Sequence, residues 1–206
     1  MKGIFGPSIL DLKFFRFKRF EFDNHLFLIA RSGWSKQGGF EIYVDDDEKG
    51  QSLFKELMSK GKDLNVRAGC PNAIERMEGG LLSYGNDMTI KDNVLECGFD
   101  GLISFNDEVE YLAKDHLKQL SLKGVKKSLI GIKIFTDSIT LHNHLPIFIN
   151  GDKIGELRSV IYSPSFKCCL GIAMIDLEIQ ENKQKQMVVI DNNEYQIEIS
   201  PLPFSQ

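Results

Sequence analysis

The chain has 206 residues, 42% of them hydrophobic, and a formal net charge of −4. Such a chain can bury a sizeable core in one large domain or two small ones, and its mixed charges exclude an overall field that would attract nucleic acid or an anionic membrane. Its four cysteines form no CxxC pair, so they indicate reduced thiols rather than a zinc site. No apolar run approaches the ~20 residues of a membrane helix, and the start lacks the order of a signal peptide, so a cytoplasmic protein is expected.

A first strand is predicted at residues 13–22, where basic and aromatic side chains alternate. Phe15, Phe17 and Phe20 are expected to give this strand a buried face. Basic and aromatic side chains are also the groups with which proteins bind single-stranded nucleic acid. On an alternating strand, however, rings and charges point to opposite faces, so a core strand is the favoured interpretation.

Two more strands and a helix follow in the first third of the chain. The strands are predicted at residues 26–32 and 39–44, joined by a connection whose glycines suit a hairpin. Residues 45–62 predict an amphipathic helix, because acidic residues stand at its start and a lysine stands near its end, as the helix dipole favours.

A second helix is expected to begin at Asn72, three residues before Glu75, in a pattern that resembles a capping box. Its apolar side is expected to include Leu81 and Leu82, which places the glycine pair of residues 79–80 inside the helix. Each glycine would cost about 1 kcal/mol relative to alanine. We therefore expect another segment to pack closely against the backbone there.

The rest of the chain predicts a connector and a small all-β domain. The fold class is α+β, with domains at residues 1–105 and 123–206 and a helical connector at 106–122. Short, evenly spaced strands with turn residues between them are typical of a barrel-like domain. These strands are predicted at residues 128–135, 146–150, 153–162, 168–176, 186–190 and 194–199.

Residues 39–44 hold the strongest candidate ligand groups. The two-residue period of a strand places Glu41 and Tyr43 on one face, opposite the apolar residues. A solvated outer face is the ordinary interpretation of such a pair. Trp34, in the glycine-rich turn before this strand, favours a ligand face instead, because an exposed ring in a flexible turn commonly marks a contact surface.

Other chemical motifs are weak or absent in the sequence. His142 and His144 stand two residues apart with no third ligand at a useful spacing, so no metal site is expected. No Ser-His-Asp, P-loop or dinucleotide-binding pattern is found.

Three segments resemble the tetrahydrofolate-dependent aminomethyltransferase (glycine cleavage T-protein) superfamily, and within it the branch of dimethylsulfoniopropionate demethylases. They are ARSGWSKQGGFEIYV at residues 30–44, IERMEGGLLSYGNDMT at 74–89 and GELRSVIYSPSFKCCLGIAMI at 155–175. The resemblance implies the C-terminal part of the T-protein folate-binding fold, followed by a small all-β barrel-like domain. It also implies tetrahydrofolate as the cofactor and a small sulfonium or aminomethyl compound as the substrate.

The same resemblance assigns roles to five residues. Glu41 matches the glutamate that holds the pterin ring, whose N–H and 2-amino groups can donate paired hydrogen bonds to a carboxylate. Tyr84 and Arg76 match positions in a motif near the folate. Trp34 and Tyr43 are candidates to recognise a sulfonium, a cation with no hydrogen to donate, through their ring faces.

The chain also departs from the family pattern. Asn72 stands where T-proteins have a folate-contacting arginine, and Arg158 replaces a threonine. Family members are nearly twice as long, and the part without a counterpart here is N-terminal and carries the catalytic aspartate, so we expect a fragment that is inactive alone and assign no catalytic residue. Two alternatives to a demethylase stay open: an aminomethyltransferase of glycine cleavage and a non-catalytic folate-binding module.

Overall fold

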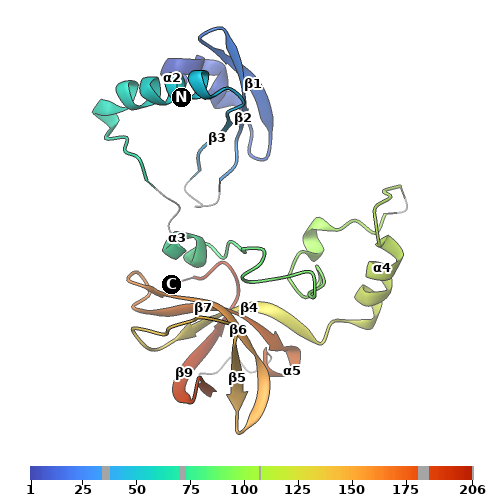
Figure 1. Ribbon diagram of the computed structural model, residues 1–206. Coiled ribbons are helices and arrows are strands. Elements are labelled where there is room, and N and C mark those ends of the chain that lie inside the picture. Colours follow the sequence, from blue (N-terminus) through green and yellow to red (C-terminus); the bar gives the residue numbers. More distant parts are fainter. Residues whose placement is uncertain (34–37, 70–72, 107, 181–185, 206) are drawn as a thin grey trace. The chain divides into compact units, whose positions relative to one another are not determined.

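The computed structural model describes residues 1–33, 38–69, 73–106, 108–180 and 186–205 (Figure 1). The chain divides into two compact units, Met1–Asn72 (unit 1) and Ala73–Gln206 (unit 2). The α+β class with a C-terminal barrel is confirmed, whereas the domain boundaries at residues 105 and 122 stay a prediction.

The described part of unit 1 is an antiparallel sheet in the order β1-β2-β3, with helices packed on one face. Asp23 and Asn24, in the connection between β1 and β2, both have positive φ, which suits a two-residue hairpin turn. The core of unit 1 lies between this sheet and the helices and contains Phe20, Phe27 and Ile29. The elements are α1 (Lys2–Phe5), η1 (Pro7–Asp11), β1 (Phe17–Phe22), β2 (His25–Ala30), β3 (Glu41–Tyr43), α2 (Asp47–Lys60) and η2 (Lys62–Leu64).

The prediction of a shared buried face for Phe15, Phe17 and Phe20 was wrong. Strand β1 begins only at Phe17, and Phe15 has a φ of 55°, outside the strand conformation. Phe17 and Phe20 are three positions apart, an odd spacing, so they point to opposite faces of the strand. Phe20 is buried, whereas Phe15 and Phe17 are 74% and 71% exposed.

Helix α2 confirms the helix predicted at residues 45–62. The side chain of Asp46 caps it by accepting a hydrogen bond from the Lys49 amide at 3.0 Å, which satisfies one of the amides left unpaired at a helix start. Leu53 is buried and packs into the core of unit 1.

Unit 2 is built on a closed barrel with the strand order β4-β7-β6-β5-β8-β9, in which β9 pairs with β4 to close the ring (Figure 1). Isoleucine, leucine and valine side chains fill the barrel interior. No helix in the described residues is both long and apolar enough to cross a membrane. The elements are α3 (Ala73–Glu78), η3 (Asp100–Leu102), α4 (Lys114–Lys123), β4 (Lys127–Ile134), β5 (Leu145–Ile149), β6 (Asp152–Ser163), β7 (Cys168–Asp176), α5 (Leu177–Gln180), β8 (Gln186–Ile190) and β9 (Asn193–Ser200).

Helix α3 is shorter than the sequence pattern predicts. It ends at Glu78, and Gly80 follows with a φ of 62°, a conformation typical of the residue after a helix. The predicted close packing is confirmed, because a Cβ atom on Gly80 would lie 3.0 Å from both Leu202 and Pro203. The glycine pair therefore ends the helix and admits the C-terminal segment.

Candidate functional site

The sheet of unit 1 has one face that its described helices do not cover. The core of unit 1 is formed by the other face, through Phe20, Phe27 and Ile29. We call the uncovered side the open face. Its side chains, all exposed or half-buried, are Phe17, Arg19, Glu21, Leu26, Leu28, Ala30, Glu41 and Tyr43.

Glu41 projects from the open face at the start of β3. Its Oε2 atom accepts a hydrogen bond from the hydroxyl of Ser32, which follows the end of β2. This bond orients the carboxylate, and the side chain stays exposed. An exposed and oriented carboxylate can accept paired hydrogen bonds from a ligand that offers two N–H groups side by side.

Tyr43 lies on the same face as Glu41, in the next row of the sheet and opposite Leu28. The side chain is 55% exposed, so its ring is accessible to a cation. The predicted pairing of Glu41 and Tyr43 on one face agrees with the burial along β3, where Ile42 packs against the core. Trp34 lies outside the described residues.

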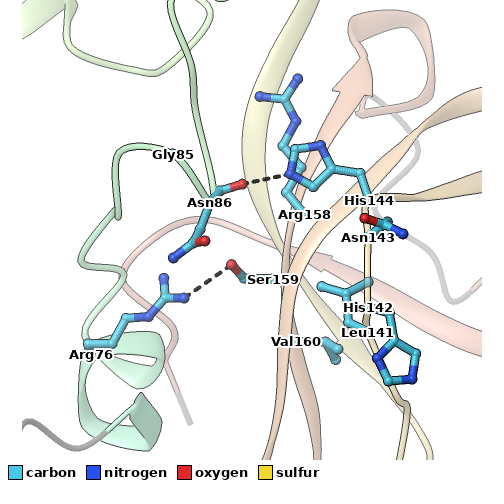
Figure 2. A pocket seen from close by; sticks show the side chains of 10 residues that line it. All are labelled: Arg76, Gly85, Asn86, Leu141, His142, Asn143, His144, Arg158, Ser159 and Val160. Atoms are coloured by element: carbon cyan, nitrogen blue, oxygen red, sulfur yellow. Dashed lines mark hydrogen bonds between the residues drawn. The ribbon is translucent and has the colours of Figure 1, made fainter.

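In unit 2, Arg76 belongs to a buried polar network. Its Nη1 donates to Asp87 Oδ2 at 2.7 Å and its Nη2 donates to Ser159 Oγ at 3.1 Å; Figure 2 shows the second bond. The Ser159 hydroxyl in turn donates to Asp87, and the Ser83 amide donates to the same carboxylate at 2.6 Å. The network ties α3 to the turn at residues 83–87 and to β6. That turn carries Tyr84, which is 71% exposed.

A second buried ion pair joins Arg158 to Asp92. The guanidinium donates to both carboxylate oxygens, at 2.8 and 2.9 Å, and to the Asp87 carbonyl at 2.9 Å. Burial acts to raise the pKa of Asp92, but hydrogen bonds from Arg158 and the Thr89 amide lower it to about 2. The pairing of β6 with β7 is irregular between Leu157 and Ser159, so Arg158 is the extra residue of a bulge, which redirects its side chain.

A cleft of about 610 Å³ lies in unit 2 between β6, the turn at residues 85–86 and the loop at 141–144 (Figure 2). His144 lines it, and its Nε2 donates to the Asn86 carbonyl at 2.8 Å. No group of three histidine, cysteine, aspartate or glutamate side chains in the described ranges could hold a metal ion. The cleft is lined by Arg76, Gly85, Asn86, Leu141, His142, Asn143, His144, Arg158, Ser159 and Val160.

The structure brings some of the predicted site residues together. Glu41 and Tyr43 share the open face of unit 1, whereas Arg76 and Tyr84 lie on neighbouring segments of unit 2. Their ligand roles stay predictions. Sequence reasoning missed Ser32, although it stands within the same motif as Glu41. It also missed two carboxylates: that of Asp87, whose partner Arg76 is 11 positions away, and that of Asp92, whose partner Arg158 is 66 positions away.

Comparison with known proteins gives two matches to family models. The family "GCVT N-terminal domain" matches residues 6–107, and the family "Glycine cleavage T-protein C-terminal barrel domain" matches residues 127–206. Together they cover most of both units.

Individual relatives agree with these families. The chain is 42% identical over 176 residues to the dimethylsulfoniopropionate demethylase of Ruegeria pomeroyi, a match that covers 85% of this chain and 48% of the demethylase. It is 27% identical over 208 residues to an aminomethyltransferase of Bacillus cereus, covering 99% of this chain and 56% of the relative. The chain thus spans about half the length of the curated relatives it matches.

A solved structure shows the same fold. The glycine cleavage system aminomethyltransferase T of Bartonella henselae matches with a TM-score of 0.78 at 21% sequence identity, covering 95% of this chain and 54% of that protein.

Proposed function

Because the chain belongs to the glycine cleavage T-protein superfamily, we propose that it provides part of the binding surface of a tetrahydrofolate-dependent methyltransferase. The methyl donor is dimethylsulfoniopropionate. Its sulfur keeps the electron pair of the broken S–C bond and becomes a neutral thioether, while N5 of tetrahydrofolate gains the methyl group and loses a proton. The products are 3-methylthiopropionate and 5-methyltetrahydrofolate.

The observation that carries this proposal is the placement of Glu41 and Tyr43 on the open face. Glu41 is an exposed carboxylate oriented by Ser32, and it would accept hydrogen bonds from the pterin ring N–H and the 2-amino group. Such a pair of bonds fixes both the position and the rotation of the ring. Fixing N5 in line with the sulfonium methyl supplies the main catalytic effect, since the sulfonium is already an activated leaving group.

Tyr43 supports the sulfonium as the donor. A sulfonium is a compact cation without hydrogen-bond donors, so aromatic faces are among the few groups that can recognise it, each contributing about 0.5 to 2 kcal/mol. Tyr43 offers an exposed ring two residues from Glu41, and we assign Trp34 the same role from its place in the sequence.

Tyr84 and Arg76 keep their proposed folate roles. Tyr84 is exposed and available for direct contact. The guanidinium of Arg76 is bonded to Asp87 and Ser159, so its contribution would be to hold the turn that carries Tyr84.

The similarity to the demethylase, 42% against 27% for the aminomethyltransferase, favours the sulfonium donor. The second candidate is an aminomethyltransferase, which the similarity to the aminomethyltransferase of Bacillus cereus supports. A non-catalytic folate-binding module is the third, since the proposed pterin contact needs only the residues of unit 1.

Calorimetric titration of the 206-residue chain with tetrahydrofolate tests the pterin contact. Glu41→Gln should weaken binding roughly 10- to 150-fold, because charge-assisted hydrogen bonds are lost. Glu21→Gln is the matched control, since Glu21 is an exposed carboxylate on the same face in a distant row. Absence of binding at millimolar tetrahydrofolate, or equal affinities for Glu41→Gln and the wild type, would refute the proposal.

A second titration tests the donor. Tyr43→Leu should weaken dimethylsulfoniopropionate binding roughly 2- to 30-fold, whereas Tyr162→Leu, at a partly exposed tyrosine of the barrel, should not. Mass spectrometry of the folate product, formed by a protein that also contains the N-terminal part of the family, separates the candidates. Formation of methylenetetrahydrofolate from an aminomethyl donor, with the sulfonium untouched, would identify an aminomethyltransferase.

A further inference from the structure

One row of the open face contains Phe17, Ala30 and Glu41. Phe17 pairs with Ala30 across β1 and β2, and Ala30 pairs with Glu41 across β2 and β3. Directly opposite residues of antiparallel strands point to the same side of the sheet. The three side chains therefore stand in line on the open face, with the smallest one in the middle.

The spacing of the strands sets the distance across this row. Neighbouring strands lie about 4.8 Å apart, so the backbones at Phe17 and Glu41 lie about 10 Å from each other across Ala30. The small side chain of Ala30 therefore stands between the two larger ones. The next row has the larger Leu28 in its middle position.

Core packing does not account for Phe17. The ring is 71% exposed, whereas Phe20 of the same strand is buried. Two other exposed rings nearby, those of Phe14 and Phe15, pack on each other with their centroids 4.3 Å apart. The aromatic contacts found among the described residues do not include Phe17.

We propose that Phe17 and Ala30, together with Glu41, form the seat of a planar heterocycle that carries N–H donors on one edge. The donor edge bonds to Glu41, one ring face rests on the Ala30 methyl group, and the remote edge lies against the Phe17 ring, an edge-to-face arrangement that aromatic rings favour. The inference rests on the proposed function, in which this heterocycle is the pterin of tetrahydrofolate, and it adds two ligand-contacting residues.

Two substitutions test the seat in the 206-residue chain. Phe17→Leu keeps an apolar side chain but removes the ring, and it should weaken tetrahydrofolate binding roughly 2- to 10-fold. Phe15→Leu is the matched control, because Phe15 is equally exposed but lies outside the strand. This variant should bind tetrahydrofolate with the affinity of the wild type. Ala30→Val places a larger side chain between Phe17 and Glu41, and valine favours strands. This variant should weaken binding at least as much as Phe17→Leu, with an unchanged circular dichroism spectrum.

The choice of probe separates this inference from the proposed function. The loss in Phe17→Leu should be the same for tetrahydrofolate and for tetrahydropterin, and absent for p-aminobenzoylglutamate, which lacks the heterocycle. If Glu41→Gln weakens binding while Phe17→Leu and Ala30→Val bind like the wild type, the seat is refuted and the proposed function stands. If the wild-type chain binds no tetrahydrofolate, the proposed function is refuted and the seat with it.

Discussion

The barrel of unit 2 and the sheet of unit 1 differ in how they cover their second face. Along β7 every residue from Cys168 to Ile175 is buried, because one face points into the barrel and the other is covered by α3 and the C-terminal segment. The sheet of unit 1 buries only the face that meets its helices. The barrel interior is therefore a packed core, whereas the open face of unit 1 offers exposed side chains to a ligand.

One ion pair from each unit shows the same contrast in burial. In unit 2 the Arg158–Asp92 pair is almost fully buried, whereas in unit 1 the ion pair of Lys49 with Asp23 is partly exposed. Burial makes a charge costly to leave alone, while water compensates an exposed one. The buried Arg158–Asp92 pair therefore stabilises the fold of unit 2, whereas the exposed carboxylate of Glu41 on the open face is available to a ligand.

The largest effect is expected from breaking the buried pair. Asp92→Ala leaves the Arg158 charge without its partner and should lower the free energy of unfolding of unit 2 by about 3–5 kcal/mol. Lys49→Ala, which breaks the exposed pair of unit 1, should cost about 0–1 kcal/mol. Urea unfolding followed by hydrogen exchange reports each unit separately, and similar losses in the two variants would contradict the contrast.

A pair of leucines tests the same contrast in burial with uncharged side chains. Leu157 is fully buried in the barrel core, and Leu26 is 51% exposed on the open face. Leu157→Ala should destabilise unit 2 by about 2–5 kcal/mol through the cavity it leaves, whereas Leu26→Ala should change stability by about 0.5 kcal/mol or less. A large loss in Leu26→Ala would show that the open face is covered in solution.

Low pH should lower the stability of unit 2, because it protonates the Asp92 carboxylate. Its pKa is lowered from 3.8 to about 2 in the folded state, so the stabilisation is complete above about pH 4 and is lost as the pH falls towards 2. The loss should be about 2 kcal/mol. Urea midpoints measured between about pH 5 and about pH 2.5 should fall less steeply in Asp92→Asn than in the wild type; equal slopes would exclude this carboxylate as the cause.

The smallest effect is expected at Ser32, which orients Glu41. Ser32→Ala should weaken tetrahydrofolate binding roughly 2- to 10-fold, the value of one hydrogen bond, and leave the unfolding of unit 1 nearly unchanged. Ser59→Ala, at an exposed position of α2, should bind like the wild type. Loss of stability without loss of affinity would make Ser32 a structural residue.

Local patterns predicted much of the fold. The strands predicted at 168–176 and 186–190 match β7 and β8 at both ends, because turn residues separate short apolar stretches. Two errors concerned element ends at which a single residue has positive φ. Phe15 has positive φ, so β1 begins after it, and Gly80 has positive φ just after the end of α3. The spacing of hydrophobic residues in the sequence does not reveal either angle.

The candidate site was predictable only within one strand. Glu41 and Tyr43 follow from the two-residue period of β3. The row of Phe17, Ala30 and Glu41 needs the register of three strands, and the bond between Asp92 and Arg158 joins residues 66 positions apart. Such contacts depend on tertiary structure and leave no local signal.

The most direct test is a pair of amide NMR spectra of the 206-residue chain, with and without tetrahydrofolate. If the open face is the folate surface, shifts should concentrate on β1, β2 and β3, with the largest near residues 17, 30 and 41, and should disappear in Glu41→Gln but persist in Glu21→Gln. Shifts confined to the cleft of unit 2, around Asn86 and His144, with β1 to β3 unchanged, would contradict the account.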